Sequence, residues 1–226
     1  MDVNQIVRIY GKRIRDSDAL QKLAAKAKTY PDAQKFATKA AEILNDLIGK
    51  EVDVATISPD ELAQIIAGTL RTNHAEVTKI CSRIQKRMNA EIGIGMNAVE
   101  PEFDAERARG VATALSDAEE PTPEYAKNIL VNFSRSIVDT SIRENAKAQK
   151  DAGLKTHIIR RYDGVGLHDG KDTCEWCLAR QGEWDDYKEA LADGAFERHP
   201  GCGCYIEYHV GKTHTWVSSA AAWHNI

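Results

Sequence analysis

The sequence predicts an α+β protein in which long helices are followed by a small β-containing zinc knuckle near the C-terminus. Apolar residues recur every three or four positions through the first two thirds of the 226-residue chain, as on one face of a helix. Short runs of β-branched and aromatic residues appear after residue 154, on either side of a group of cysteines. We therefore expect a helical body over residues 1–154, a zinc-binding module over 155–218 and a tail over 219–226.

The N-terminal part is expected to form two helices. Residues 3–28 and 33–48 are rich in Ala, Lys, Gln and Leu, which have high helix propensities. Gly49 follows the second segment and is the expected end of that helix, because glycine is a poor helix former. The apolar positions of the second segment are spaced by three and four residues: Phe36, Ala40, Ile43, Leu44 and Leu47.

A third and longer helix is expected to begin after Ser58. Ser58 can act as the N-cap, Pro59 suits the first helical position, and Glu61 can bond back to the cap in a capping box. The apolar residues that follow form a seam of about eight turns, so this helix needs a partner helix. The seam consists of Leu62, Ile66, Leu70, Val77, Ile80, Ile84, Met88 and Ile92.

The partner helix is expected to begin after Thr122. Residues 93–123 are rich in Gly, Pro and acidic residues, which indicates a connection with one short helix inside it. Thr122 is a suitable N-cap, and Gly153 lies where the next helix should end. One face of that helix is apolar: Tyr125, Ile129, Phe133, Ile137 and either Ser141 or Ile142.

Two strands are expected in the C-terminal third. Residues 156–162 and 204–210 contain β-branched and aromatic residues in alternation with polar ones. They lie on either side of the cysteine group. Pairing between these strands would therefore bring the cysteines together.

The cysteines indicate a metal site rather than disulfide bonds. The chain has five of them, with Cys81 alone and the other four within residues 174–204. A secreted disulfide scaffold would spread them along the chain, whereas close pairs in a reducing compartment more often hold a metal. Cys81 lies on the apolar seam and is expected to be a small buried hydrophobic residue.

The predicted metal is zinc, and its candidate ligands are Cys174, Cys177, Cys202, Cys204 and His199. Zinc prefers a tetrahedron of sulfur and nitrogen donors, and the CxxC spacing lets both sulfurs face one ion from a single turn. Glycine and proline residues between His199 and Cys204 permit the tight loop that supplies the second half. Five donors compete for four positions: either Cys202 and Cys204 both bind the ion, or His199 and Cys202 bind it and Cys204 begins the strand. The expected role is structural, in place of the core that so small a module lacks.

Three segments of the second half follow one another in an order that resembles a known family. SIRENA at 141–146 precedes a predicted strand, DTCEWCLARQG follows at 172–182, and HPGCGC occupies 199–204. This order resembles the C-terminal domain of phage Mu F-like minor head proteins, which have an aspartate, a CxxC, a short LxG segment and then HPxCxC or HPxCxH. The resemblance covers roughly residues 130–210. It departs from the family at Gly203, where a basic residue is common.

The resemblance implies a phage minor head protein, a capsid component of the virion that acts by binding during head morphogenesis near the portal. Such a protein is assembled in the host cytoplasm, and its partners would be portal or other capsid proteins. Self-association into an oligomer is compatible with this role. The family's last donor varies between cysteine and histidine, which favours Cys204 as a ligand. No reaction is implied, so no catalytic residue is expected.

The overall charge gives no general reason to bind nucleic acid or membranes. The formal net charge is −4 at pH 7, and the chain has no long apolar run and no apolar signal core. Neither membrane insertion nor secretion is therefore expected. The long helices and the first strand are rich in basic residues, and these form the one surface where packaged DNA could bind. A solvated helix face is the simpler explanation for these basic residues. They are Arg71, Lys79, Arg83, Lys86, Arg87, Arg135, Arg143, Lys147, Lys150, Arg160 and Arg161.

Alternative functions follow from other residues. His74 and Glu76 form an H-x-E motif that, with the CxxC motif, is typical of zinc deaminases, where three donors hold a catalytic zinc. The proline that usually precedes the first cysteine is replaced by threonine here. His168 and Asp169 suggest a zinc-dependent hydrolase, although a simpler expectation is that they position the CxxC turn. A zinc-bearing nucleic-acid-binding protein is the third alternative.

Overall fold

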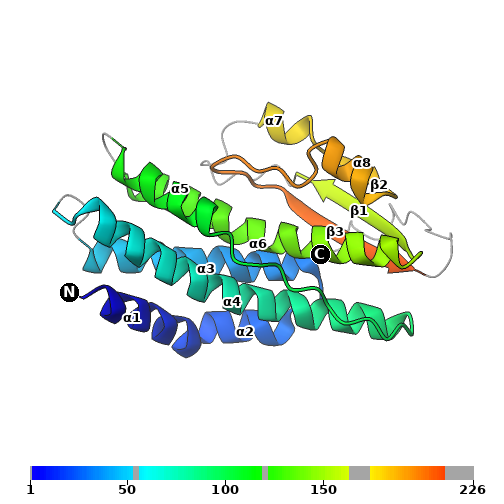
Figure 1. Cartoon of the computed structure of the whole chain (residues 1–226), viewed down its shortest axis with the longest axis horizontal. Helices are drawn as coiled ribbons and strands as arrows, with labels where there is room; N and C mark the ends of the chain where they lie inside the picture. Colours follow the sequence, from blue (N-terminus) through cyan, green and yellow to red (C-terminus); the bar gives the residue numbers. More distant parts are fainter. Residues whose placement is uncertain (1, 53–55, 119–121, 163–173, 212–226) are drawn as a thin grey trace.

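The structure is a computed structural model that describes residues 2–52, 56–118, 122–162 and 174–211. It has the predicted fold class, since long helices are followed by a small antiparallel sheet near the C-terminal end (Figure 1). The predicted tail lies outside the described residues. The helices of the first two thirds are α1 (Val3–Asp16), α2 (Asp18–Lys26), α3 (Tyr30–Glu51), α4 (Pro59–Glu91), α5 (Ala105–Ser116) and α6 (Pro123–Asp151).

The helix starts predicted at Ser58 and Thr122 are confirmed. Ser58 accepts a hydrogen bond from the backbone N–H of Glu61, and the Glu61 carboxylate accepts one from the N–H of Ser58 in return. The hydroxyl of Thr122 likewise accepts a bond from the N–H of Tyr125. Each cap satisfies N–H groups that the first turn of a helix leaves without a partner.

The N-terminal boundaries differ from the prediction at two points. The segment 3–28 is divided at Ser17, whose backbone is extended and whose hydroxyl caps α2. Gly49 does not end α3, which continues to Glu51. Val52, which follows the last turn, is buried in the core. The last turn persists because the burial of this side chain outweighs the low helix propensity of one glycine.

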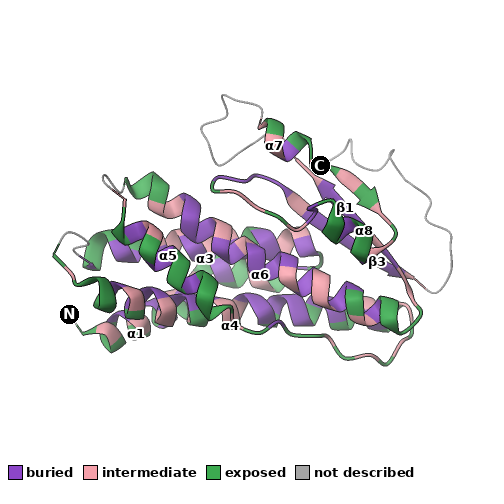
Figure 2. Ribbon diagram, turned by 45° about the horizontal axis from the view of Figure 1, so that its top comes forward, coloured by how far each residue is buried: buried purple, intermediate pink, exposed green. Residues whose placement is uncertain are grey.

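The helices α3, α4 and α6 lie side by side along the length of the molecule, and α1, α2 and α5 pack against them (Figure 1). Figure 2 shows in purple that their facing sides are buried. Removing these apolar faces from water holds the helices together. Cys81 is 2 % exposed, as predicted for a core residue, and burial raises the pKa of its thiol to about 12.

The two predicted strands are confirmed, and they pair with each other. β1 (Lys155–Arg161) and β3 (Tyr205–Gly211) run antiparallel, with Ile158 opposite Tyr208. A third strand, β2 (Gly182–Trp184), pairs with the other edge of β1, so the strand order is β2-β1-β3. The sequence did not predict β2 because three residues are too few to show a pattern. Two short helices flank β2 in the sequence: α7 (Glu175–Leu178) and α8 (Tyr187–Ala192).

A buried polar chain joins β3 to three helices. The Tyr208 hydroxyl donates to Oε1 of Gln149 on α6, and the Gln149 amide donates to Oδ1 of Asn89 on α4 at 2.6 Å. Gln85, also on α4, donates to the same oxygen at 2.9 Å and accepts from the hydroxyl of Tyr30 on α3 at 2.7 Å. All five side chains are buried. Since an unpaired polar group in a core is costly, this chain fixes how the sheet sits on the helices.

Gln149→Ala should lower the free energy of unfolding by about 1–3 kcal/mol, because the Tyr208 hydroxyl and Asn89 each lose a partner inside the core. Urea unfolding followed by circular dichroism measures this change. Lys86→Ala, on the exposed side of α4, is the control and should stay within about 0.5 kcal/mol of the parent protein. Equal unfolding free energies for the two variants would contradict the role of the polar chain.

Candidate metal centre

Cys174 and Cys177 lie at the start of α7, a helix of one turn. Cys174 is the N-cap residue, and its sulfur accepts a hydrogen bond from the backbone N–H of Cys177 at 3.4 Å. The turn brings both sulfurs to one side, as expected from the CxxC spacing. Cys177 is fully buried, and Cys174 is partly exposed.

His199, Cys202 and Cys204 lie on the loop that leads into β3. The N–H of Cys202 donates to the carbonyl oxygen of His199 at 3.0 Å, which closes a turn. Gly201 inside this turn has a φ of 78°, a conformation that residues with a Cβ rarely adopt. The tight loop expected from the glycine and proline residues is therefore present, and it buries both of its cysteines.

The two segments bring the five candidate donors together. The ligand atoms of Cys174, Cys177 and His199 lie within 4.8 Å of one another, and so do those of Cys177, Cys202 and Cys204. Cys177 belongs to both groups, and its sulfur lies 3.8 Å from that of Cys202. Zinc–sulfur bonds of about 2.3 Å place two sulfurs of a tetrahedral site about 3.8 Å apart. These residues can therefore hold a metal ion.

His199 has the orientation of a metal-binding histidine. Its Nε2 lies 3.2 Å from the sulfur of Cys174 and 3.1 Å from that of Cys177. Its Nδ1 lies 2.7 Å from the carbonyl oxygen of Pro200, a contact that calls for a proton on Nδ1. In a neutral ring, Nε2 then keeps its lone pair and directs it at the two sulfurs. Trp176 packs edge-on against the ring, with 4.9 Å between centroids.

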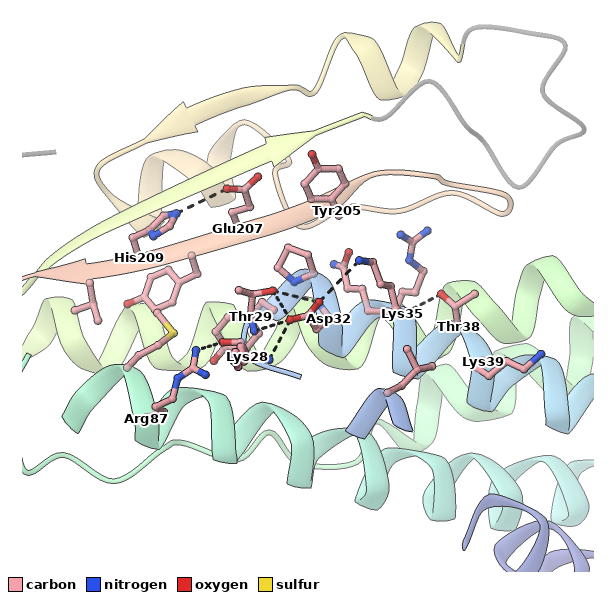
Figure 3. Close-up of a pocket in the computed structure, with 18 of the residues that line it drawn as sticks. Lys28, Thr29, Asp32, Lys35, Thr38, Lys39, Arg87, Tyr205, Glu207 and His209 are labelled. Carbon is pink, nitrogen blue, oxygen red and sulfur yellow. Dashed lines mark hydrogen bonds and ion pairs between the residues drawn. The ribbon is translucent and has the colours of Figure 1, made fainter. Parts of the chain in front are cut away.

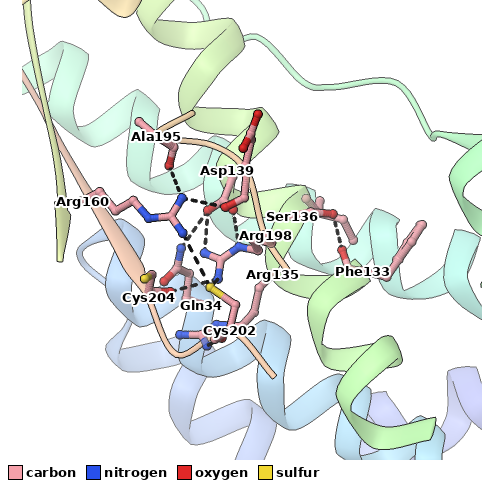
Figure 4. Close-up of polar contacts among 12 residues, drawn as sticks. Gln34, Phe133, Arg135, Ser136, Asp139, Arg160, Ala195, Arg198, Cys202 and Cys204 are labelled. Atoms are coloured by element: carbon pink, nitrogen blue, oxygen red, sulfur yellow. Dashed lines mark hydrogen bonds and ion pairs between the residues drawn. The ribbon is translucent and has the colours of Figure 1, made fainter. Parts of the chain in front are cut away.

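Arg160 of β1 lies beside the sulfurs and is 2 % exposed (Figure 4). Its guanidinium donates to the carbonyl oxygens of Ala195 at 2.8 Å and Glu197 at 2.6 Å, and it lies 3.7 Å from the sulfur of Cys202. Carbonyl oxygens satisfy N–H groups without neutralising the charge. A thiolate at the centre supplies the negative charge that a buried cation requires.

Arg198 ties the second donor loop to α6 (Figure 4). Its guanidinium makes two bonds to the Asp139 carboxylate, one of them 2.9 Å long, and both side chains are 2 % exposed. Gln34 of α3 donates a further bond to Asp139 at 2.9 Å. Arg198 also donates to the carbonyl oxygen of Cys204 at 2.9 Å and lies 3.8 Å from the sulfur of Cys202. Arg135 of α6 also donates to the carbonyl oxygen of Cys202, at 2.8 Å. Two side chains of α6, Asp139 through Arg198 and Arg135 directly, therefore hold this loop.

The surroundings give the buried cysteines different thiol pKa values. A hydrogen bond from Cys204, together with the guanidinium groups of Arg198 and Arg160, lowers the pKa of the Cys202 thiol to about 4, although burial opposes this. The pKa of Cys204 is raised because it donates that bond and is buried. Burial also raises the pKa of Cys177 to about 12. A bound cation would oppose the effect of burial, since it stabilises thiolates.

Of the residues proposed for enzymatic functions, His74 and Glu76 lie in the described part of the chain, and they do not join this centre. His74 packs edge-on against Phe103, with 5.6 Å between ring centroids, and Glu76 forms an ion pair within α4. Neither residue belongs to a donor group in the described part of the chain. The H-x-E motif therefore does not assemble with the cysteines. His168 and Asp169 lie outside the described residues.

Most basic residues considered for DNA binding make contacts within the chain. Arg83 and Arg87 of α4 donate to the carbonyl oxygens of Ala24 and Lys28, near the C-terminal end of α2. Ala24 lies in the last turn of α2, where carbonyl groups have no partner within the helix, and Lys28 lies in the connection to α3. Arg160, expected on a basic face, is instead buried beside the cysteines because three backbone carbonyls and a sulfur accept its bonds. Ion pairs engage Lys79, Arg143, Lys147, Lys150 and Arg161.

Comparison of the chain with protein-family models, curated proteins and solved structures found no match in any of the three. In the part of the chain that the structure describes, no helix is long and apolar enough to span a bilayer. Proposals about function therefore rest on the donor cluster with its surroundings and on the motifs of the sequence.

Asp139→Ala should lower the free energy of unfolding by about 3–5 kcal/mol, because the Arg198 guanidinium stays buried without its counter-charge. Adding Arg198→Met removes the buried cation and should recover much of that loss. Asp151→Ala, which removes an exposed carboxylate from the same helix, is the control and should cost at most about 1 kcal/mol. Urea unfolding measures all three variants. A double variant no more stable than Asp139→Ala would contradict the importance of the ion pair.

Proposed function

We propose that this chain is a phage minor head protein whose C-terminal module is fastened by a structural zinc ion. The single observation that carries the metal assignment is that four cysteine sulfurs and one imidazole nitrogen from two segments form two donor groups that share Cys177. Zinc is the metal that such sulfur and nitrogen donors most often bind, with four protein ligands in structural sites.

In this proposal the four ligands are Cys174, Cys177, Cys202 and His199. The bond from Nδ1 to a backbone carbonyl is typical of metal-binding histidines, and it favours His199 over Cys204, the residue that the sequence favoured. Cys204 then lies against the sulfur of Cys202 without binding the ion. Four protein donors leave no position for water, which supports a structural role over a catalytic one.

The resemblance to phage Mu F-like minor head proteins supports the biological role. It spans roughly residues 130–210, which correspond to most of α6, the three strands and both donor segments. These elements are physically linked, since α6 leads into β1 and its Asp139 holds the second donor loop. The resemblance therefore coincides with one linked unit of the fold. A protein of this kind acts by binding portal or other capsid proteins.

The proposal predicts that the chain is present in purified phage particles made by the genome that encodes it, as detected by mass spectrometry and immunoblotting. Cys177→Ser removes a sulfur common to both donor groups and should exclude the chain from particles. Cys81→Ala changes the cysteine that lies away from the centre and should leave incorporation unchanged. Particles that lack the parent chain, while the lysate contains it in soluble form, would contradict the proposal.

A further inference from the structure

A large groove lies between β3, the first half of α3 and the C-terminal end of α4 (Figure 3). Its volume is about 1190 Å³. Sites for small molecules usually measure about 300–1,000 Å³, so the groove suits a larger occupant. None of the five candidate metal ligands lines it, and the groove is therefore a separate feature from the metal centre.

The groove runs along an edge strand. In the sheet of three described strands, β3 lies at an edge. Glu207 and His209 belong to one face of β3, and Tyr208 and Val210 belong to the other, because successive side chains alternate. All four line the groove. A cavity lined from both faces of a strand must pass along its edge, where an extended peptide can add as a further strand.

The floor of the groove is largely apolar. Tyr30 and Pro31 at the start of α3 and Met88 and Ile92 at the end of α4 line it together with Tyr208. Alternate side chains of an added strand would point toward this surface, and their burial would contribute to binding. The floor therefore fits a peptide with apolar residues at every second position.

The carboxylates that line the groove are already engaged by groups of the chain itself. Asp32 accepts bonds from the N–H groups of Lys28 and Thr29. Glu42 forms ion pairs with Lys39 and Lys127, and Glu91 forms one with Arg87. Glu207 lies within 4 Å of Arg161. The four carboxylates are outnumbered by five basic side chains along the groove: Lys28, Lys35, Lys39, Arg87 and Arg135.

Lys28 and Lys35 extend from the rim near the N-terminal end of α3 (Figure 3). Both are exposed, and the Lys35 side chain is 70 % exposed with its ammonium group 3.8 Å from the engaged Asp32. With five basic side chains and four carboxylates, the lining has a formal charge of +1. The positive excess favours acidic groups in a bound segment.

We propose that this groove binds an extended acidic segment of a partner protein as a fourth strand beside β3. Acidic side chains of that segment face Lys28 and Lys35, and its alternate apolar side chains cover the floor formed by α3 and α4. This inference goes beyond the proposed function and does not depend on the metal.

The test uses the full chain and a fluorescein-labelled peptide as long as β3, seven residues, in which Glu and Val alternate. Fluorescence anisotropy should show saturable binding, and Lys28→Glu with Lys35→Glu should weaken it roughly tenfold. Lys12→Glu with Lys22→Glu changes two exposed lysines outside the groove by the same charge and should have little effect. Equal weakening by both pairs, or no binding, would overturn the proposal.

Two further measurements separate strand addition from simple charge attraction and from other occupants. A peptide with Pro in place of Val keeps the charge but loses the N–H groups of the replaced residues and the ability to extend a regular strand, so it should bind much more weakly. Amide shifts in the nuclear magnetic resonance spectrum should move along residues 205–210. Equal binding of the Pro peptide would overturn the proposal. Tighter binding of single-stranded DNA than of the acidic peptide would also overturn it, and so would a dimer of this chain in which the same amides are protected.

Discussion

The buried ion pair between Arg198 and Asp139 is the constraint on which the placement of the metal centre depends. Both groups lose their hydration, and this loss is compensated only because the guanidinium makes two bonds to the carboxylate. Gln34 adds a third bond, so α3 and α6 both hold the pair. Arg198 in turn holds the backbone of Cys204. The helical body therefore positions the donor loop, while the loop's own glycine and proline residues shape its turn.

The metal donors and the hydrophobic core stabilise different parts of the C-terminal module. Ile158 and Ile206 belong to the apolar core that the sheet shares with the helices, whereas Cys177, Cys202 and Cys204 form a separate buried cluster. The sequence suggested that a metal replaces a missing core. The structure shows that the sheet already packs its apolar face against α3 and α6. A metal would therefore fix the two donor segments to each other and would not replace this core.

The helices with strong local signals were predictable from sequence, because caps such as those at Ser58 and Thr122 act within one turn. The donor residues were also predictable, since their spacing reflects local geometry. Three features were not predictable: the short strand β2, the burial of Arg160, and the pairing of Arg198 with Asp139. Each depends on contacts between segments far apart in the chain, which leave no periodic pattern in the sequence.

X-ray absorption at the zinc edge of the metal-loaded protein tests the structural metal centre most directly. We expect three sulfur neighbours at about 2.3 Å and one nitrogen neighbour at about 2.0 Å, with no oxygen. His199→Ala should remove the nitrogen signal, and Cys204→Ser should leave the sulfur count unchanged. A water or carboxylate oxygen bound to the ion in the parent protein, or failure of the protein to bind zinc, would contradict a structural zinc site.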